Sequence, residues 1–373
     1  FWRIEGLSFF NDANGTMVRV EDHGTQGPAN NIQLVNNHFT SGDLPTIQDW
    51  VDHVSDAMRL YVDDGPLVVR CNEMVNVAMG FVVGGSHTDV IGNTVEYFSR
   101  DGIATGGHFN RFIGNRIYDS VKLGDGHHDD FFQSHMGANP DLSSDVEITG
   151  NIFVNRYGSG QPADTLGPTQ CLSAFEDGPK TRIRITNNVC KGDHWHGITW
   201  YDTNNSVIVN NIAVGGSNFA GLPPGASSWP SYSWISVDGA GNTIRNNITT
   251  RNLSGGDNNI EIQPGEESLY FADWLALDLE HAPGSPAIDA GNPDGAALYD
   301  IEGRPRYAQP DIGAYVAPLE PAPYKIGGPF RAAFGPFFAC FLAHTTSMNL
   351  RNRRKTASND APKSIHHLCG AGS

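Results

Sequence analysis

The chain has 373 residues, of which 39% are hydrophobic and only 17% are charged, and its formal net charge is −17. This composition provides enough apolar residues for a core without indicating a membrane protein, and the negative charge repels nucleic acid. It also repels anionic glycans, so an acidic polysaccharide would need a local cluster of Lys and Arg or a bound cation.

The first residues already resemble a strand in the middle of a repeat. Phe1 to Leu7 contain neither the basic segment nor the apolar segment of a targeting signal, so we expect further residues upstream of them. The chain then contains 43 glycines and many Asn-Asn, Gly-Asn and Asp-Gly pairs. Such pairs predict short strands joined by tight turns, without long helices.

One pattern recurs along the chain: an alternating apolar run, an Asn-Asn or Gly-Asn pair, and a second apolar pair. The second Asn of each pair is Asn37, Asn93, Asn115, Asn151, Asn188, Asn211 or Asn247. From Asn93 onward the steps are 22, 36, 37, 23 and 36 residues, which fits a turn of about 22 residues with inserted loops. We therefore predict an all-β parallel β-helix with Asn in left-handed turns and ladders of stacked Asn side chains. A β-sandwich would not produce this fixed step.

A second motif recurs in phase with the first. It predicts five inward-facing residues at one strand position of successive coils: Ile103, Phe132, Leu172, Ile198 and Ile235. The next residues, Gln133, Ser173, Thr199 and Ser236, should then face outward, followed two positions later by His135, Phe175, Tyr201 and Asp238. Such rows should form a shallow polar groove that suits an extended polymer.

The densest group of proton-handling side chains lies between 124 and 135, where a loop meets a strand. We expect His127, His128, Asp129 and Asp130 to be catalytic, since histidine exchanges protons near neutral pH. Asp125, Asp129 and Asp130 are candidate ligands for Ca²⁺, which prefers carboxylate oxygens. The alternative is a turn cap or a structural cation site.

A second group, at 194–202, falls two coils later and should stack close to the first. His196 or Tyr201 is a candidate acid for the leaving oxygen, whereas Trp200 alternates inward and belongs to the core. Other polar or aromatic side chains of the two groups and their surroundings are expected to bind substrate: Arg100, Lys122, Gln133, His135, Glu176, His194, Trp195 and Asp202. Arg100, Lys122, Lys180 or Arg182 could neutralise a substrate carboxylate, although Arg182 also fits a solvated strand face.

The five cysteines are too irregularly spaced for a disulfide framework and include no Cys-x-x-Cys metal motif. A bridge between Cys171 and Cys190 is one option, but buried free thiols are favoured.

The repeat ends near residue 265. We predict a β-helix over 1–265, a C-terminal cap over 266–320, where a solenoid must cover its open edge, and a disordered or non-native tail over 321–373. The basic run in that tail is expected to be solvated.

The Asn-marked coils, together with Gly284-Ser-Pro-Ala-Ile-Asp-Ala-Gly291 and Asp311-Ile-Gly-Ala-Tyr315, resemble a group of secreted bacterial proteins. These are the pectate-lyase-like right-handed parallel β-helix proteins, which include polysaccharide lyases and uronan C5-epimerases. The resemblance covers about residues 1 to 320. Asp125-Gly-His-His-Asp129 is similar to the Asp-Pro-His-Asp motif of alginate epimerases but has an extra residue and no Pro. The resemblance implies a secreted or periplasmic, monomeric enzyme with a polysaccharide substrate.

These observations predict proton abstraction at C5 of a uronate, followed by β-elimination or epimerisation. His127 or His128 would be the base, and Ca²⁺ could assist. Two alternatives stay open: a glycoside hydrolase that uses paired carboxylates from Asp129, Asp130, Glu176, Asp177 and Asp202, and a non-catalytic glycan-binding β-helix. The density of histidines favours the first interpretation.

Overall fold

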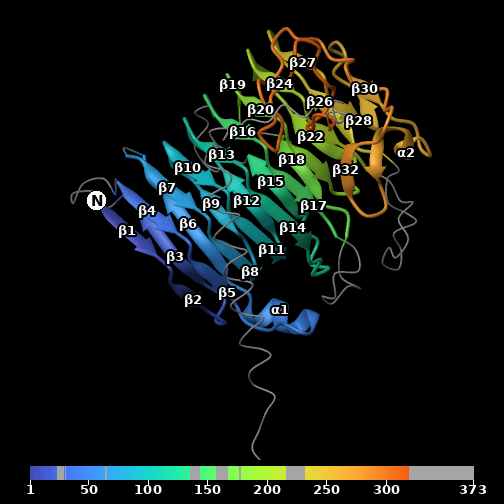
Figure 1. Cartoon of the computed structure of the whole chain (residues 1–373). Coiled ribbons are helices and arrows are strands. Elements are labelled where there is room, and N and C mark those ends of the chain that lie inside the picture. The colour runs from blue at the N-terminus through green and yellow to red at the C-terminus, as the bar shows by residue number, and fades with distance from the viewer. Residues whose placement is uncertain are drawn as a thin grey trace, which may run out of the picture. The chain divides into compact units, whose positions relative to one another are not determined.

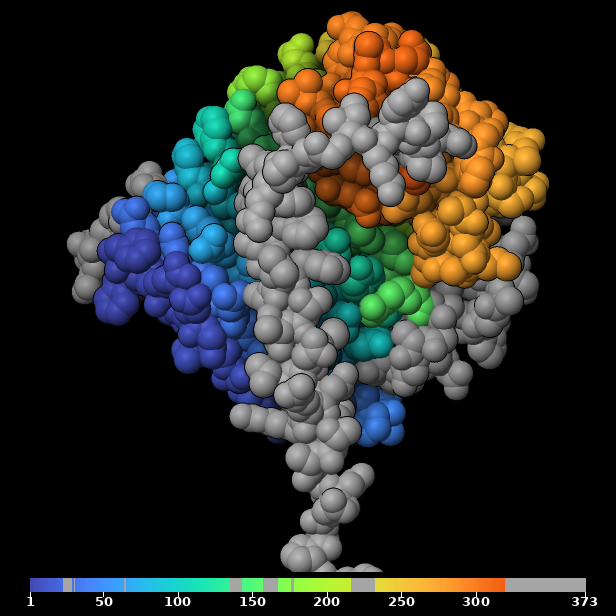
Figure 2. Space-filling view, in the orientation of Figure 1, coloured from blue at the N-terminus to red at the C-terminus, as the bar shows by residue number. Residues whose placement is uncertain are grey.

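The computed structural model describes residues 1–22, 29, 31–63, 65–134, 143–156, 167–175, 178–215 and 232–318, and within these the predicted right-handed parallel β-helix is confirmed (Figure 1). Each coil contributes one strand to each of three long parallel sheets, which we call sheets A, B and C. In the space-filling view, the described surface passes from blue to orange in successive bands, as expected when coils contact mainly their neighbours (Figure 2).

The strands of each sheet follow in stacking order. Sheet A contains β1 (Trp2–Glu5), β4 (Ile32–Val35), β7 (Leu67–Arg70), β10 (Thr88–Ile91), β13 (Arg111–Ile113), β16 (Glu147–Thr149), β20 (Arg184–Thr186), β24 (Val207–Val209) and β27 (Thr243–Arg245). Sheet B contains β2 (Ser8–Phe10), β5 (His38–Thr40), β8 (Glu73–Val77), β11 (Thr94–Phe98), β14 (Arg116–Ser120), β17 (Ile152–Val154), β21 (Val189–Lys191), β25 (Ile212–Ala213), β28 (Ile248–Thr249) and β30 (Ile260–Glu261). Sheet C contains β3 (Thr16–Glu21), β6 (Asp56–Tyr61), β9 (Phe81–Val83), β12 (Asp101–Thr105), β15 (Asp130–Ser134), β18 (Gln170–Ala174), β22 (His196–Trp200), β26 (Trp234–Val237) and β29 (Arg251–Asn252).

The turn between sheets A and B explains the paired Asn pattern. The first member of a pair adopts a positive φ, as at Asn187 (54°), whereas the second member is buried and stacks on its equivalent in the next coil. At Asn115, for example, Oδ1 accepts bonds from N and Nδ2 of Asn93, both at 3.0 Å, while Nδ2 donates to Asn151 Oδ1 at 3.0 Å. The ladder also includes Asn72, which the pair pattern missed because Cys71 occupies the positive-φ position before it.

The predicted core row of sheet C is confirmed. Register pairing aligns Ile103, Phe132, Leu172, Ile198 and Ile235, and all five side chains are fully buried. Trp200 is fully buried too, as predicted. Register pairing also aligns the predicted outward row of Gln133, Ser173, Thr199 and Ser236, but Ser173 and Thr199 are fully buried and not exposed. Both hydroxyls are engaged by neighbouring polar groups, so the exposed polar ribbon is interrupted at these two strands.

Cys171 and Cys190 form a disulfide with their Cα atoms 6.0 Å apart, within the usual range. The favoured expectation of free thiols was therefore wrong for this pair. The irregular spacing gave no signal, because β18 and β21 belong to different sheets whose inward residues meet in the core.

Several shorter elements complete the described fold. α1 (Ile47–His53) begins with a capping box formed by Thr46 and Asp49. A small parallel pair joins β19 (Lys180–Thr181) to β23 (Thr203–Asn204), and α2 (Glu267–Tyr270) leads into an antiparallel pair of β31 (Phe271–Asp273) and β32 (Asp278–His281).

The segment after β30 packs on the last coils. Its buried residues Phe271, Leu279 and Ile312 share an apolar cluster with Ile212 and Ile248 of sheet B. None of the helices in the described residues is long and apolar enough to cross a membrane.

Candidate functional site

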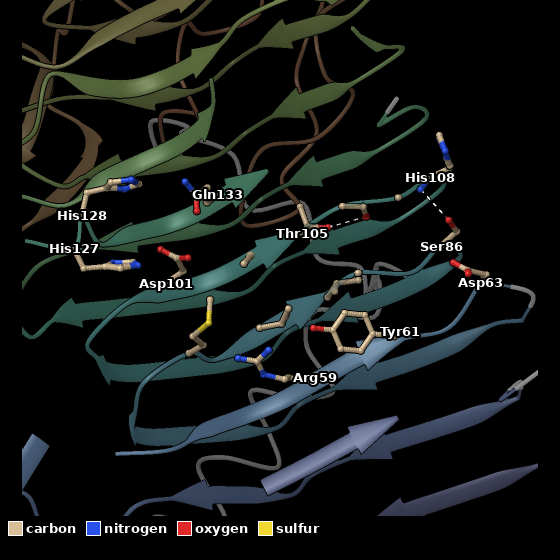
Figure 3. A pocket seen from close by; sticks show the side chains of 17 residues that line it. Arg59, Tyr61, Asp63, Ser86, Asp101, Thr105, His108, His127, His128 and Gln133 are labelled. Atoms are coloured by element: carbon tan, nitrogen blue, oxygen red, sulfur yellow. Dashed lines mark hydrogen bonds between the residues drawn. The ribbon is translucent and has the colours of Figure 1, made fainter. Parts of the chain in front are cut away.

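A cavity of about 630 Å³ opens on the outer face of sheet C, over β6, β9, β12 and β15. His127 and His128 lie side by side at one end, next to Asp101 and Gln133, and His108 lies at the other end (Figure 3). The strand alternation that directs Ile103 and Phe132 into the core directs their neighbours toward this face. The cavity is therefore built on a rigid sheet, with the two histidines supplied by the loop that enters β15.

The two histidines each pair with a buried carboxylate two residues on. His128 Nδ1 lies 2.8 Å from Asp130 Oδ2, and His127 Nδ1 lies 3.9 Å from Asp129 Oδ1. These contacts raise the pKa of both imidazoles, chiefly through the interaction of each ring with its paired carboxylate. Because Nδ1 of His128 faces Asp130, its Nε2 is left for a ligand, and the side chain is 57% exposed. We call His128 and Asp130 the dyad.

The dyad is held from below by neighbouring strands. Asp130 is fully buried, and its Oδ1 accepts a bond from Ser173 Oγ at 2.5 Å. Its backbone N–H donates to Asp101 Oδ1 at 3.2 Å across the β12–β15 pair. Burial, followed by the charge of Asp130, raises the pKa of Asp101 to about 8. Asp101 can therefore keep a proton at neutral pH beside the two histidines.

Cationic groups gather around this acidic cluster. Lys122 Nζ lies 3.0 Å from Asp129 Oδ2. The pKa of Asp129 is raised, mainly because the residue is buried. Arg59 lines the cavity and is held by Asp56 Oδ2, with Nε at 2.8 Å and Nη2 at 2.7 Å. Arg100 is exposed, and its charge lowers the pKa of His127, which places it nearby. Two of these cations are therefore paired with carboxylates, Lys122 with Asp129 and Arg59 with Asp56.

The second predicted group lies on the same sheet, since β15, β18 and β22 are consecutive strands. Burial and the charge of neighbouring histidines lower the pKa of His194 to about 3 and of His196 to about 4, and His128 contributes to both shifts. His196 is therefore neutral at pH 7 and cannot supply a proton as an imidazolium. Its Nδ1 lies 3.1 Å from Thr199 Oγ1.

Of the other residues of that group, Trp195 precedes β22, whereas Tyr201 and Asp202 follow it. Tyr201 follows β22, at the end opposite to His196, and its ring packs 5.9 Å from Phe175. Asp202 is an exposed turn residue with a φ of 51°. Trp195 is 42% exposed beside His194 and His196. Tyr201 and Asp202 do not line the cavity.

The predicted calcium ligands do not converge within the described residues. Asp125 accepts the N–H of His127 at 3.0 Å in its own turn, while Asp129 faces Lys122 and Asp130 faces His128. No group of three His, Cys, Asp or Glu side chains is placed to hold a metal ion in the part of the chain that the structure describes. A requirement for Ca²⁺ stays a prediction without a described site, as do roles for His135 and Glu176, which lie outside the described residues.

Sequence reasoning missed Arg59, Tyr61 and His108, all of which line the cavity. A signal was present, because Met58 and Leu60 alternate with Arg59 and Tyr61 just as the predicted rows do. Register pairing places Met58 beside Phe81, and Phe81 beside Ile103. The Asn pair did not point to this strand, because the segment that contains α1 separates Asn37 from β6 within the same coil.

The fold and cavity together define a class: a parallel β-helix with a groove of titratable side chains on one sheet. No family model matches the sequence, and no curated protein matches it. Among solved structures, pectate lyase Pel9A is similar at 14% identity and a TM-score of 0.39, over 82% of this chain and 87% of that one. The alginate lyase AlyGC, of family PL6, is 14% identical at 0.36, over 69% and 37%, and the Dettilon tailspike protein is 15% identical at 0.33, over 69% and 58%. These likenesses concern the fold alone.

Proposed function

We propose that this protein is a carbohydrate-active enzyme that removes the C5 proton of a uronate unit in an acidic polysaccharide. Nε2 of His128 is the base, oriented by the bond from Nδ1 to Asp130. Arg59 and the charged form of His127 face the same cavity and stabilise the negative charge that develops on the uronate carboxyl group. The observation that carries the proposal is this dyad at one end of a cavity that Arg59 and His127 also line.

The later steps decide the product. In β-elimination the C5–H bond breaks, a C4–C5 double bond forms, and the C4–O bond breaks while the leaving oxygen takes a proton. Asp101 supplies that proton, since it keeps it up to about pH 8 and lies beside the histidines. In epimerisation the C4–O bond stays intact, and the carbanion formed at C5 takes a proton from Asp101 on its opposite face. We therefore assign the role of the acid to Asp101, and not to His196 or Tyr201, which were the acids expected from the sequence.

The second candidate function is glycoside hydrolysis by paired carboxylates, because register pairing aligns Asp101 of β12 with Asp130 of β15. However, Asp130 is fully buried, and both of its oxygens are occupied, by His128 and Ser173. It can therefore orient a histidine but cannot reach a sugar or a water in the groove. This arrangement favours the histidine as the reacting group.

The Cys171–Cys190 bridge supports an oxidising location for this enzyme, secreted or periplasmic. An extracellular polysaccharide would be accessible there.

A product screen over a panel of uronans, with and without chelator, tests the function. Ultraviolet absorbance from an unsaturated product indicates a lyase, and a changed C5 configuration without cleavage indicates an epimerase. New reducing ends without that absorbance would contradict proton abstraction and support a hydrolase. Binding of a glycan without any product would indicate a non-catalytic β-helix, and loss of activity in chelator would establish the metal requirement.

The pH dependence of kcat/KM should be bell-shaped. His128 must be neutral to act as a base, and its pKa is raised above 6.5, so activity should rise with pH through that higher value. Asp101 must keep its proton and His127 its charge, so activity should fall again at higher pH, for Asp101 above about pH 8. Initial rates on the best uronan, measured across this range, test both limbs. A kcat/KM profile that is flat from about pH 6 to about pH 9 would contradict both assignments.

Asp101→Asn should lower kcat by about 10² or more, because the amide can still accept the N–H bond from Asp130 but has no proton to transfer. Tyr201→Phe is the matched comparison and should retain activity, since its hydroxyl does not line the cavity. Steady-state kinetics of both variants distinguish the two acids. Loss of activity in Tyr201→Phe alone would restore the role expected from the sequence.

A further inference from the structure

Beyond the cavity, three aromatic rings lie in a row on the same side of the molecule. Trp195 and Trp234 have centroids 6.3 Å apart and planes 27° apart, and Trp234 and Tyr232 have centroids 6.1 Å apart and planes 31° apart. We call these three residues the aromatic shelf. The centroid separations exceed that of closely stacked rings, so the rings are offset and leave ring surface uncovered. Trp195 is 42% exposed, and the other two are half-buried.

The shelf is fixed by polar and aromatic contacts below it. Trp234 Nε1 donates to Thr199 Oγ1 at 2.9 Å, and the Trp234 ring meets His196 edge-on at 5.0 Å. The backbone N–H of Trp234 donates to the Trp195 carbonyl at 2.8 Å, which joins the two tryptophans across β22 and β26. A ligand that binds here loses little free energy to ordering of these rings.

A cation lies at the end of the shelf. The guanidinium of Arg251 is 5.2 Å from the centroid of the Tyr232 ring, and the residue is exposed. Register pairing places Arg251 beside Trp234, so β29 continues the same face. Within the described ranges, no carboxylate lies within ion-pair distance of Arg251. An exposed arginine beside aromatic rings can bind a planar carboxylate through two parallel hydrogen bonds.

The shelf continues the line of the candidate site. The strands follow in the order β15, β18, β22, β26 and β29, and His128 is close enough to His194 and His196 to lower the pKa of both. With strands about 4.8 Å apart, β26 lies about 14 Å from β15 along the stacking direction. A polymer that reaches His128 can therefore extend over the shelf.

We propose that the aromatic shelf and Arg251 form a distal subsite for a second uronate unit of the polysaccharide. The rings pack against the apolar C–H face of the sugar, and Arg251 binds its carboxylate. This proposal rests on the proposed function for the identity of the polymer. We therefore expect this surface to affect the affinity for the polymer and not the rate of the chemical step.

Affinity gel electrophoresis tests the subsite without relying on turnover. All proteins carry His128→Ala so that the polymer is not consumed, and the gels contain alginate, polygalacturonate or hyaluronate. Trp195→Ala should weaken retention by roughly three- to tenfold. Trp2→Ala, which removes a 72%-exposed tryptophan from sheet A, should have no effect.

A second pair of variants tests the contribution of the Arg251 charge to binding. Arg251→Gln should weaken retention by the native uronan but not by its carboxyl-reduced form, whereas Trp195→Ala should weaken both. Arg184→Gln, an exposed arginine of sheet A, is the matched control. Variants that bind like the controls would overturn the subsite while leaving the proposed function intact. A parent protein that no uronan retards would also overturn the subsite, and the product screen would then decide the proposed function. Shelf-dependent retention in a protein that makes no product would instead overturn the proposed function alone.

Discussion

Replacing His128 with alanine is expected to lower kcat by about 10²- to 10⁴-fold, because the group that takes the C5 proton is removed. The fold should be unaffected, since the His128 side chain is 57% exposed and contacts the sheet through its bond to Asp130. Single-turnover kinetics on the uronan found in the screen, together with the thermal unfolding midpoint, measure both quantities.

His108→Ala is the control for this variant. His108 lines the same cavity at its opposite end, where its Nδ1 lies 3.0 Å from Ser144 Oγ. It should leave kcat within a few-fold of the parent value while changing KM at most. Retained turnover in His128→Ala would remove that residue from the mechanism, and equal losses in both variants would indicate a general effect on the groove.

Asn115→Ala is expected to destabilise the fold by at least about 3 kcal/mol, because several buried polar groups lose their partners together. The N and Nδ2 groups of Asn93 lose their acceptor, and the carbonyl of Val90 loses the donor at 2.9 Å. No water can replace the amide without entering a closely packed interior. Urea unfolding followed by circular dichroism gives the free energy of unfolding.

Gln48→Ala provides the comparison for the ladder variant. Gln48 is an exposed helix residue whose amide donates to Asp52 Oδ2 at 2.9 Å, so its replacement should change stability by about 0.5 kcal/mol or less. If Asn115→Ala were equally mild, the Asn ladder would be a by-product of the turns and not a source of stability.

Much of the fold could be predicted because the coil repeats one constraint. Each turn from sheet A to sheet B needs a residue that tolerates positive φ and an amide that bonds above and below, so Asn-Asn and Gly-Asn recur. Cys71 shows where this signal fails, since a cysteine occupies the positive-φ position and conceals a ladder step. The Cys171–Cys190 bridge was misjudged because it depends on which inward residues of two sheets meet.

The candidate site could be predicted only in part. The run from His127 to Asp130 is local, so its chemistry is visible in the sequence, and the strand phase correctly placed it on the sheet of β22. Arg59 and Asp101 reach the groove only through the stacking of β6, β9, β12 and β15, which sequence neighbours do not reveal. The depressed pKa of His196 depends on burial, which residue type alone does not indicate.

The C5 hydrogen isotope effect tests the central claim most directly. Turnover of a uronan deuterated at C5 should be slower than that of the unlabelled polymer when the chemical step is isolated by single-turnover measurement, because the dyad breaks that bond. Equal rates for the two polymers, with new reducing ends forming in both, would show that the C5–H bond stays intact and that the groove of His128 performs a different reaction.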